Sequence, residues 1–452
     1  MRINGYRTPR QSAQGLFRAF AMPALAALFF CSAASLAAEP QPAFPGAVGW
    51  AANTIGGRGG KIIRVTTLAP TGPGSLTAAL DTDGPRIVVF EVGGIIDFAR
   101  REIKIVKPFL TVAGQTAPSP GITLVRTGID VGTHDVILQH IRVRTGTAGA
   151  AKRQGWEPDA FSTVSGAYNI IVDHCSMTWA IDENLSASGP RFTGNTPDDW
   201  RKGTSHSITF SNNIIAEGLA HATHSKGEHS KGSLIHDNVN DILIVGNLYA
   251  HNYERNPLFK GGVRGMVINN LIYDPGPRAV HYNLIPEEWG DHAYQTGQLT
   301  LVGNVLRAGP STPHDVALFM LGGSGDIELY EADNIAVDRL GKPLEKTGRY
   351  TTSKAAILPM KKPAMPQGVT PLRAIDVQDS VIDNAGARPW DRDRVDARIV
   401  ADTIEGRGEI INSEEEVGGY PQDVATQQGF DEKDWDLTTM VPHNPPKTRK
   451  RP

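Results

Sequence analysis

The chain has 452 residues, and its 45 Lys and Arg against 48 Asp and Glu leave a net charge of −3, too acidic overall for a typical nucleic-acid binder. This length allows up to about three domains, although a single elongated β domain can also use it. The 48 Gly and 31 Pro follow no collagen period and indicate many turns.

The N-terminus has the pattern of a secretory signal peptide, which we assign to residues 1–37. Four arginines precede an apolar run over residues 19–30, and Ser35, Leu36 and Ala37 fit a cleavage site. The apolar run is short for a membrane-spanning helix. Removing the leader takes four positive charges and no acid, so the net charge changes from −3 to −7. We therefore expect a secreted monomer, periplasmic or extracellular, that contacts neither membrane nor nucleic acid.

Short β-rich segments bounded by Gly, Asn, Asp or His dominate the chain from residue 60 to about 305. Polar residues recur near their ends at gaps of 34, 39, 34, 23 and 34 residues, namely at His140, His174, Asn213, Asn247, Asn270 and Asn304. The shortest gap fits one coil of a solenoid, and the longer gaps fit a coil with a protruding loop. We therefore predict an all-β protein whose residues 38–340 form a right-handed parallel β-helix, with asparagine side chains bonding neighbouring coils. A β-sandwich is the alternative, but it does not predict a repeated corner residue.

Two further segments are predicted around this solenoid. Residues 74–80 form a short amphipathic helix with Ser75 as N-cap, which would cover the open end of the core. Residues 341–452 form a C-terminal extension packed on the β-helix. Within it, residues 343–372 lack periodicity and should run as a strap, residues 377–385 favour a helix, and residues 447–452 read as a basic solvated tail. Cys175, the one cysteine beyond the leader, is expected to be a buried small hydrophobe.

Four blocks of sequence resemble the pectate lyases of polysaccharide lyase family 1. They lie in the order known from that family and span roughly residues 44–273. They are residues 44–47 with 56–60 (FPGA, GGRGG), 159–162 with 171–176 (DAFS, IVDHCS), 207–213 (SITFSNN) and 255–262 (RNPLFKGG).

The resemblance implies a parallel β-helix enzyme that cleaves α-1,4-polygalacturonate by Ca²⁺-assisted β-elimination. Arg255 matches the family's catalytic arginine and would take the proton at C5, while Lys231 and Lys260 would bind sugar carboxylates. Lys260 stands where the family usually has arginine, so it would act as a point charge without the two-pronged guanidinium. Lys226 competes with Lys231, because the tripeptide Ser-Lys-Gly occurs twice.

The same resemblance implies a calcium site of hard oxygen ligands contributed by more than one coil. The expected ligands are Glu157, Asp159, Asp182 and Glu183. The family's last acid corresponds to Ser186 here, which departs from the pattern.

Other polar residues near these blocks are open to two interpretations. Asp173 and His174 are expected to be a packed, hydrogen-bonded pair. Trp156 and Trp179 would either stack on sugar rings or be buried. Four histidines could form a transition-metal site or line the sugar groove, and we favour the groove edge; they are His221, His224, His229 and His236.

Three alternatives to a pectate lyase stay open from the sequence. The first is a lyase for another uronan. The second is a polygalacturonase-like hydrolase, but no clustered pair of Asp on adjacent strands stands out. The third is a non-catalytic carbohydrate-binding solenoid, which would have no reason to place Arg255 and Lys260 beside paired acids.

Overall fold

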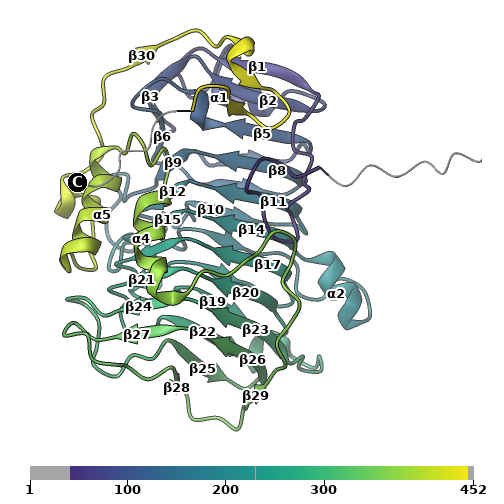
Figure 1. Ribbon diagram of the computed structural model, residues 1–452, viewed down its shortest axis with the longest axis vertical. Helices are drawn as coiled ribbons and strands as arrows, with labels where there is room; N and C mark the ends of the chain where they lie inside the picture. Colours follow the sequence, from purple (N-terminus) through teal and green to yellow (C-terminus); the bar gives the residue numbers. More distant parts are fainter. Residues whose placement is uncertain (1–40, 230, 446–452) are drawn as a thin grey trace, which may run out of the picture. The chain divides into compact units, whose positions relative to one another are not determined.

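The computed structural model describes residues 41–229 and 231–445. The predicted signal peptide over residues 1–37 and the basic tail over residues 447–452 lie outside the described residues. The regular structure is mostly β-strand, arranged in three long sheets, which we call sheets 1, 2 and 3. In Figure 1 their strands lie one above another, as successive coils of a parallel β-helix.

Sheet 1 has 11 strands, each paired in parallel with the next coil. They are β1 Lys61–Val65, β2 Arg86–Phe90, β5 Leu110–Ala113, β8 His134–Gln139, β11 Tyr168–Asp173, β14 His206–Ser211, β17 Asn240–Val245, β20 Arg264–Ile268, β23 Gly297–Val302, β26 Ile327–Ala332 and β29 Ile357–Pro359.

Sheet 2 has nine strands, several of them only two or three residues long. They are β4 Ile103–Ile105, β7 Ile129–Val131, β10 Phe161–Thr163, β13 Ser186–Ala187, β16 Leu234–Ile235, β19 Leu258–Lys260, β22 Val280–Leu284, β25 Phe319–Gly323 and β28 Thr347–Arg349.

Sheet 3 has ten strands, of which the last, β30, pairs antiparallel with β3. They are β3 Val92–Asp97, β6 Ile122–Val125, β9 Ile141–Arg144, β12 Ser176–Thr178, β15 Ile214–Ala216, β18 Leu248–Ala250, β21 Leu271–Tyr273, β24 Val305–Arg307, β27 Ile335–Val337 and β30 Thr426–Gln427. A separate pair joins β31 Trp435–Asp436 to β32 Val441–Pro442.

The predicted parallel β-helix is confirmed, with the right-handed crossover that parallel strands adopt in nearly all proteins. Many predicted segments cross a corner and supply strands to two sheets: residues 135–144 become β8 and β9. The interior is filled by rows of like residues, because in-register pairing places equivalent positions side by side. Ile170 pairs with Val136 on one side and Ile208 on the other, and all three side chains are buried.

The predicted capping helix is confirmed as α1, Leu76–Leu80. The Ser75 hydroxyl accepts a hydrogen bond from the Ala78 N–H at 3.2 Å and satisfies one free donor of the first turn. The helix contacts β1 and β2 and buries Leu76 and Leu80 in the main core. It therefore covers apolar side chains of the first coils.

The first half of the segment predicted as a strap, residues 343–372, forms strands instead. β28 and β29 pair in parallel with β25 and β26, so coil pairing continues to Pro359, past the boundary predicted at residue 340. The segment has few apolar residues and no periodicity, and the backbone pairing offered by the preceding coil nevertheless orders it as strand.

The C-terminal extension then packs against sheet 3 through α4, Ala374–Asn384, and α5, Arg394–Glu405 (Figure 1). The helix predicted over residues 377–385 corresponds to α4. Buried ion pairs join α5 to sheet 3: Arg144 Nη2 lies 2.7 Å from Asp396 Oδ1 and 3.1 Å from Asp393 Oδ2. The other helices are α2 Pro197–Gly203, α3 Pro286–Trp289 and 3₁₀ turns at Gly114–Thr116, Glu414–Val417 and Glu432–Asp434. Within the described ranges, no helix is long and apolar enough to cross a membrane.

Asparagines at the corner between sheets 1 and 3 form a continuous ladder. Asn213 Nδ2 donates to Asn247 Oδ1 at 2.9 Å, and Asn247 Nδ2 donates to Asn270 Oδ1 at 2.9 Å. The same contact continues through Asn304 to Asn334. An amide side chain both donates and accepts, so identical residues can bond along the whole row.

Two of the predicted corner residues lie outside this ladder. The residue below Asn213 is Cys175, whose N–H donates to Asn213 Oδ1 at 2.8 Å. His140 and His174 lie one position earlier, where their rings stack with centroids 5.1 Å apart. The gap of 39 residues between His174 and Asn213 is accordingly one residue longer than the distance from Cys175 to Asn213. Cys175 is buried in the core as predicted, and burial raises the pKa of its thiol.

The ladder yields a stability prediction. Asn247→Ala leaves the Asn213 N–H and the Phe210 carbonyl buried without their partners, 2.8 and 3.0 Å away in the native chain. We expect the free energy of unfolding to fall by about 3 kcal/mol, because each unpaired buried group costs about 1–3 kcal/mol. Urea denaturation measures the loss. Asn384→Ala, at the exposed end of α4, is the control and should change stability by less than about 0.5 kcal/mol. Equal effects of the two variants would show that the ladder is dispensable.

Candidate active site

The predicted site residues gather where coils leave sheet 3 and enter sheet 2. Asp159 precedes β10, Asp182 and Glu183 lie between β12 and β13, and Lys231 precedes β16. Backbone bridges link Glu183 to Lys231 and Lys231 to Glu254 in parallel, so these three residues occupy the same position on successive coils. The Lys231 ammonium lies 2.5 Å from Glu254 Oε1. Negative, positive and negative side chains thus alternate along the row.

Arg255 lies beside this row and faces the carboxylates. Its φ of 62° is in the left-handed region, which is unfavourable for a residue with a side chain and which many corner residues of this chain also adopt. The guanidinium pairs with Glu183 Oε1, and its Nε lies 3.9 Å from Glu254 Oε1. Burial lowers the pKa of Arg255, and the carboxylates of Asp182 and Asp159 act against that shift.

Three of the four predicted calcium ligands come together. Carboxylate oxygens of Asp159, Asp182 and Glu183 all lie within 4.8 Å of one another. Asp159 Oδ1 also accepts the Glu183 N–H at 2.9 Å, which ties the two coils together. Burial and the neighbouring charge of Asp182 raise the pKa of Asp159. Repulsion between these carboxyl groups would be relieved by a bound cation.

Glu157, the fourth predicted ligand, faces a loop. Its Oε1 accepts the Ser225 N–H at 2.6 Å and lies 3.6 Å from His224 Nδ1. Hydrogen bonds from Ser225 lower the pKa of Glu157. Ser186, where the resemblance implies an acid, is buried in β13 and its hydroxyl accepts the Leu234 N–H at 3.0 Å. It therefore serves coil packing.

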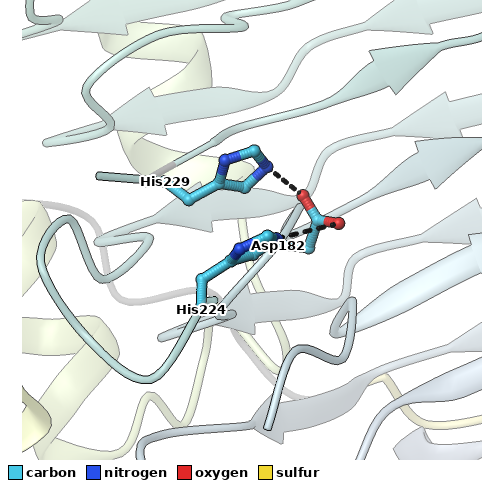
Figure 2. Close-up of side chains that lie close together, drawn as sticks. All are labelled: Asp182, His224 and His229. Carbon is cyan, nitrogen blue, oxygen red and sulfur yellow. Dashed lines mark ion pairs between the residues drawn. The ribbon is translucent and has the colours of Figure 1, made fainter. Parts of the chain in front are cut away.

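The loop between β15 and β16 covers Asp182 with two histidines (Figure 2). His229 Nε2 lies 2.6 Å from Asp182 Oδ1, and His224 Nε2 lies 3.7 Å from Asp182 Oδ2. The two rings stack with centroids 3.9 Å apart. The other two histidines point elsewhere, His221 toward Glu228 and His236 toward Asp237. The sequence grouped all four, and only the folded loop separates the pair on Asp182 from the rest.

The predicted substrate-binding lysines differ in their surroundings. Lys231 is buried within the charged row, whereas its competitor Lys226 is exposed on the loop. Lys260 ends β19 and its ammonium lies 2.6 Å from Glu288 Oε2. An acid therefore already balances each of the two buried lysines.

Arg278 is a cation of the site that sequence reasoning missed. It pairs with Glu254 Oε2, and its guanidinium lies 4.8 Å from the centre of the Tyr350 ring. Glu254 is thus shared by Lys231 and Arg278. A signal was present in the sequence, because Arg278 follows Arg255 by 23 residues, the same spacing that separates Asn247 from Asn270.

The remaining candidates are structural. Asp173 Oδ2 lies 2.8 Å from His174 Nδ1 at the corner between sheets 1 and 3, as predicted for a packed pair. Trp179 is fully buried and its Nε1 donates to Glu217 Oε2 at 2.9 Å, so it cannot stack on a sugar. Trp156 is half-buried and donates to the Gly146 carbonyl at 3.0 Å.

Comparisons with known proteins agree with this architecture. A scan against protein-family models found no match. The chain is 32% identical over 424 residues to "Probable pectate lyase C" of Emericella nidulans, and the alignment covers 88% of this chain and 89% of the relative. The fold of this chain resembles that of Jun a 1, the major allergen from cedar pollen. The TM-score is 0.52, with 15% identity over 75% of this chain and 92% of that one. A pectate lyase bound to a hexasaccharide gives a TM-score of 0.50 and 14% identity over 78% and 99%.

Fold and sequence together define the class of this protein as a polysaccharide lyase built on a parallel β-helix. The chain belongs to the pectate lyase family.

The buried Lys231 yields a prediction about pH. Burial lowers its pKa from 10.5 to about 8, so between these values the unfolded chain binds more protons than the folded one. The free energy of unfolding should therefore rise with pH over this range, by about 2 kcal/mol relative to Lys231→Met. Urea denaturation of both proteins at pH 7.5 and 10 measures the difference. Lys226→Met, on the exposed part of the same loop, should follow the wild-type profile. Parallel profiles for wild type and Lys231→Met would contradict the assignment.

Proposed function

We propose that the chain cleaves α-1,4-polygalacturonate by Ca²⁺-assisted β-elimination, with Arg255 as the base. The observation that carries the proposal is the position of Arg255, directly beside a cluster of three carboxylates and next to Lys231 and Arg278. Cations and acids in this order suit an acidic sugar whose own carboxylate needs a counter-charge. Secretion is part of the proposal and rests on the leader assigned to residues 1–37.

The reaction removes one proton and breaks one bond. The base takes the proton from C5 of the uronate, the electron pair forms the C4–C5 double bond, and the C4–O bond breaks. The departing oxygen takes a proton, which gives a new chain end and an unsaturated sugar. Negative charge develops on the C6 carboxylate before the bond breaks, so cations held there lower the barrier.

Arg255 must be neutral when it accepts the proton. A free guanidinium has a pKa above 12, which makes arginine a poor base in water. Burial lowers the pKa of Arg255 and so favours its neutral form. Glu183 opposes this effect by pairing with the guanidinium. An alkaline pH optimum follows, because only a fraction of Arg255 is neutral at lower pH.

The carboxylate cluster fits calcium. Asp159, Asp182 and Glu183 offer hard oxygen ligands from adjacent coils, and Asp182 Oδ1 is buried without a hydrogen bond of acceptable geometry. Bound Ca²⁺ would supply positive charge to the sugar carboxylate. The protein's own part is to hold the three carboxylates together through the Asp159–Glu183 backbone bond. Glu157 would support the loop beside this cluster.

Substrate carboxylates would be bound by the three cations in or beside the charged row. Lys231 and Arg278 share Glu254, and Lys260 is held by Glu288. An anionic sugar therefore competes with acids of the protein for each cation. We propose that Lys231 and Arg278 contact the sugar next to the scissile bond, and that Lys260 contacts a neighbouring one.

A spectroscopic assay tests the activity. Polygalacturonate incubated with the protein and Ca²⁺ at alkaline pH should show rising ultraviolet absorbance, since each cut creates a conjugated double bond. Arg255→Ala should lower kcat by about 10²–10⁴-fold, the usual contribution of a positioned base. Arg264→Ala, at the exposed first residue of β20 in sheet 1, is the control and should keep wild-type rates.

The outcomes separate the alternatives. New reducing ends without absorbance would identify a hydrolase, and neither signal would identify a binding protein. A rise in absorbance with another uronan but not with polygalacturonate would support β-elimination and contradict the proposed substrate. Wild-type rates for a folded Arg255→Ala variant, checked by its melting temperature, would exclude Arg255 as the base.

Removal of metal tests the calcium part separately. A calcium chelator should abolish the absorbance signal, and added Ca²⁺ should restore it. Asp159→Asn should raise the Ca²⁺ concentration needed for half-maximal rate by about tenfold or more, because one charged oxygen ligand is lost. Asp315→Asn, an exposed residue outside the site, should leave that concentration unchanged. Full activity after exhaustive chelation would contradict calcium dependence.

A further inference from the structure

The loop between β15 and β16 contributes a set of ligand atoms that an oxygen-only calcium site does not need. Nitrogen atoms of His224 and His229 and a carboxylate oxygen of Asp182 all lie within 4.8 Å of one another, and both histidines are buried (Figure 2). We propose that Asp182, His224 and His229 bind a first-row transition-metal ion such as Zn²⁺. The site would adjoin the carboxylate cluster and share Asp182 with it.

The ligand types decide the class of ion. Calcium takes oxygen ligands, whereas imidazole nitrogen suits zinc, copper, nickel and iron. Two imidazoles and one carboxylate form a common protein ligand set for such ions and leave positions open for water. The set therefore favours a borderline ion over Ca²⁺.

The contacts around Asp182 Oδ1 suit a bound cation. This atom is buried and makes no hydrogen bond of acceptable geometry, even though His229 Nε2 lies only 2.6 Å away. A cation bound by both lone pairs would satisfy Oδ1, whose isolation in the interior is otherwise costly.

The backbone of the loop is anchored on both sides of the two histidines. The His229 N–H donates to the Ala220 carbonyl at 2.8 Å, and the Gly227 N–H donates to the His224 carbonyl at 3.0 Å. The Thr223 hydroxyl donates to the Trp156 carbonyl at 2.5 Å. These bonds hold the rings over Asp182 and reduce the entropy lost when a metal binds.

Glu157 completes the arrangement as a positioning residue for His224. A histidine that binds metal through Nε2 carries its proton on Nδ1 and donates it to an oxygen, often of a carboxylate. Glu157 Oε1 lies 3.6 Å from His224 Nδ1. His224 Nδ1 accepts the Lys226 N–H at 3.1 Å, so metal binding would replace this bond with one from Nδ1–H to Glu157.

Direct binding of the metal alone tests the proposal. Tag-free protein, stripped with a chelator, is titrated with Zn²⁺ by calorimetry, and with Co²⁺ while its visible d–d absorption is followed. We expect one ion per chain. His224→Gln, His229→Gln and Asp182→Asn should each weaken binding at least tenfold. His221→Gln is the matched control, because His221 lies on the same loop, is largely exposed and faces Glu228 4.0 Å away.

The outcomes either support the site or overturn it. Loss of the Co²⁺ spectrum in the His224 and His229 variants, with the His221 variant unchanged, supports it. Equal weakening by His221→Gln would show adventitious binding to loop histidines and overturn it. Wild-type affinity retained in a His224→Gln, His229→Gln double variant would also overturn it, provided that metal-free melting temperatures match. The readout uses no substrate, so failure of the lyase assay leaves this test intact.

Discussion

Parallel pairing in register brings equivalent positions of consecutive coils to within about 4.8 Å, and the interior and the site both depend on this spacing. Apolar residues gain from the arrangement, as the row Val136, Ile170 and Ile208 shows. Asparagine gains as well, because its amide donates to one neighbour and accepts from the other. At these positions successive coils thus repeat the same type of side chain.

The same spacing is unfavourable for charged side chains of one sign, because like charges stacked about 4.8 Å apart repel. The row Glu183, Lys231 and Glu254 alternates in sign, and Glu254 is shared between Lys231 and Arg278. The cations of the site are therefore largely neutralised before substrate arrives. Under the proposed function, a substrate carboxylate would have to replace a carboxylate of the protein at each cation.

Asp182 connects the two kinds of chemistry in the site. It belongs to the oxygen cluster with Asp159 and Glu183, and the loop between β15 and β16 also places two histidines on it. An ion bound by the two histidines would compete with an ion in the carboxylate cluster for Asp182. The proposed transition-metal site would therefore bring a second ion into competition with calcium, through a loop that the repeating coils do not specify.

The sequence determined the coil architecture, because short β-rich segments and polar corner residues recur at coil spacing and in-register pairing converts this recurrence into contact. It also determined the capping helix at Ser75, and the family resemblance implied the grouping of Arg255, Lys231, Asp159, Asp182 and Glu183, which the folded coils bring together. Only the tertiary structure decided that β28 and β29 extend the sheets, that His140 and His174 lie outside the asparagine ladder, and that Glu157 faces the loop. It alone also selected His224 and His229 from four histidines. The reason is physical: coil positions repeat and can be read from spacing, whereas a protruding loop has no repeat, and its side chains are placed by contacts with distant residues.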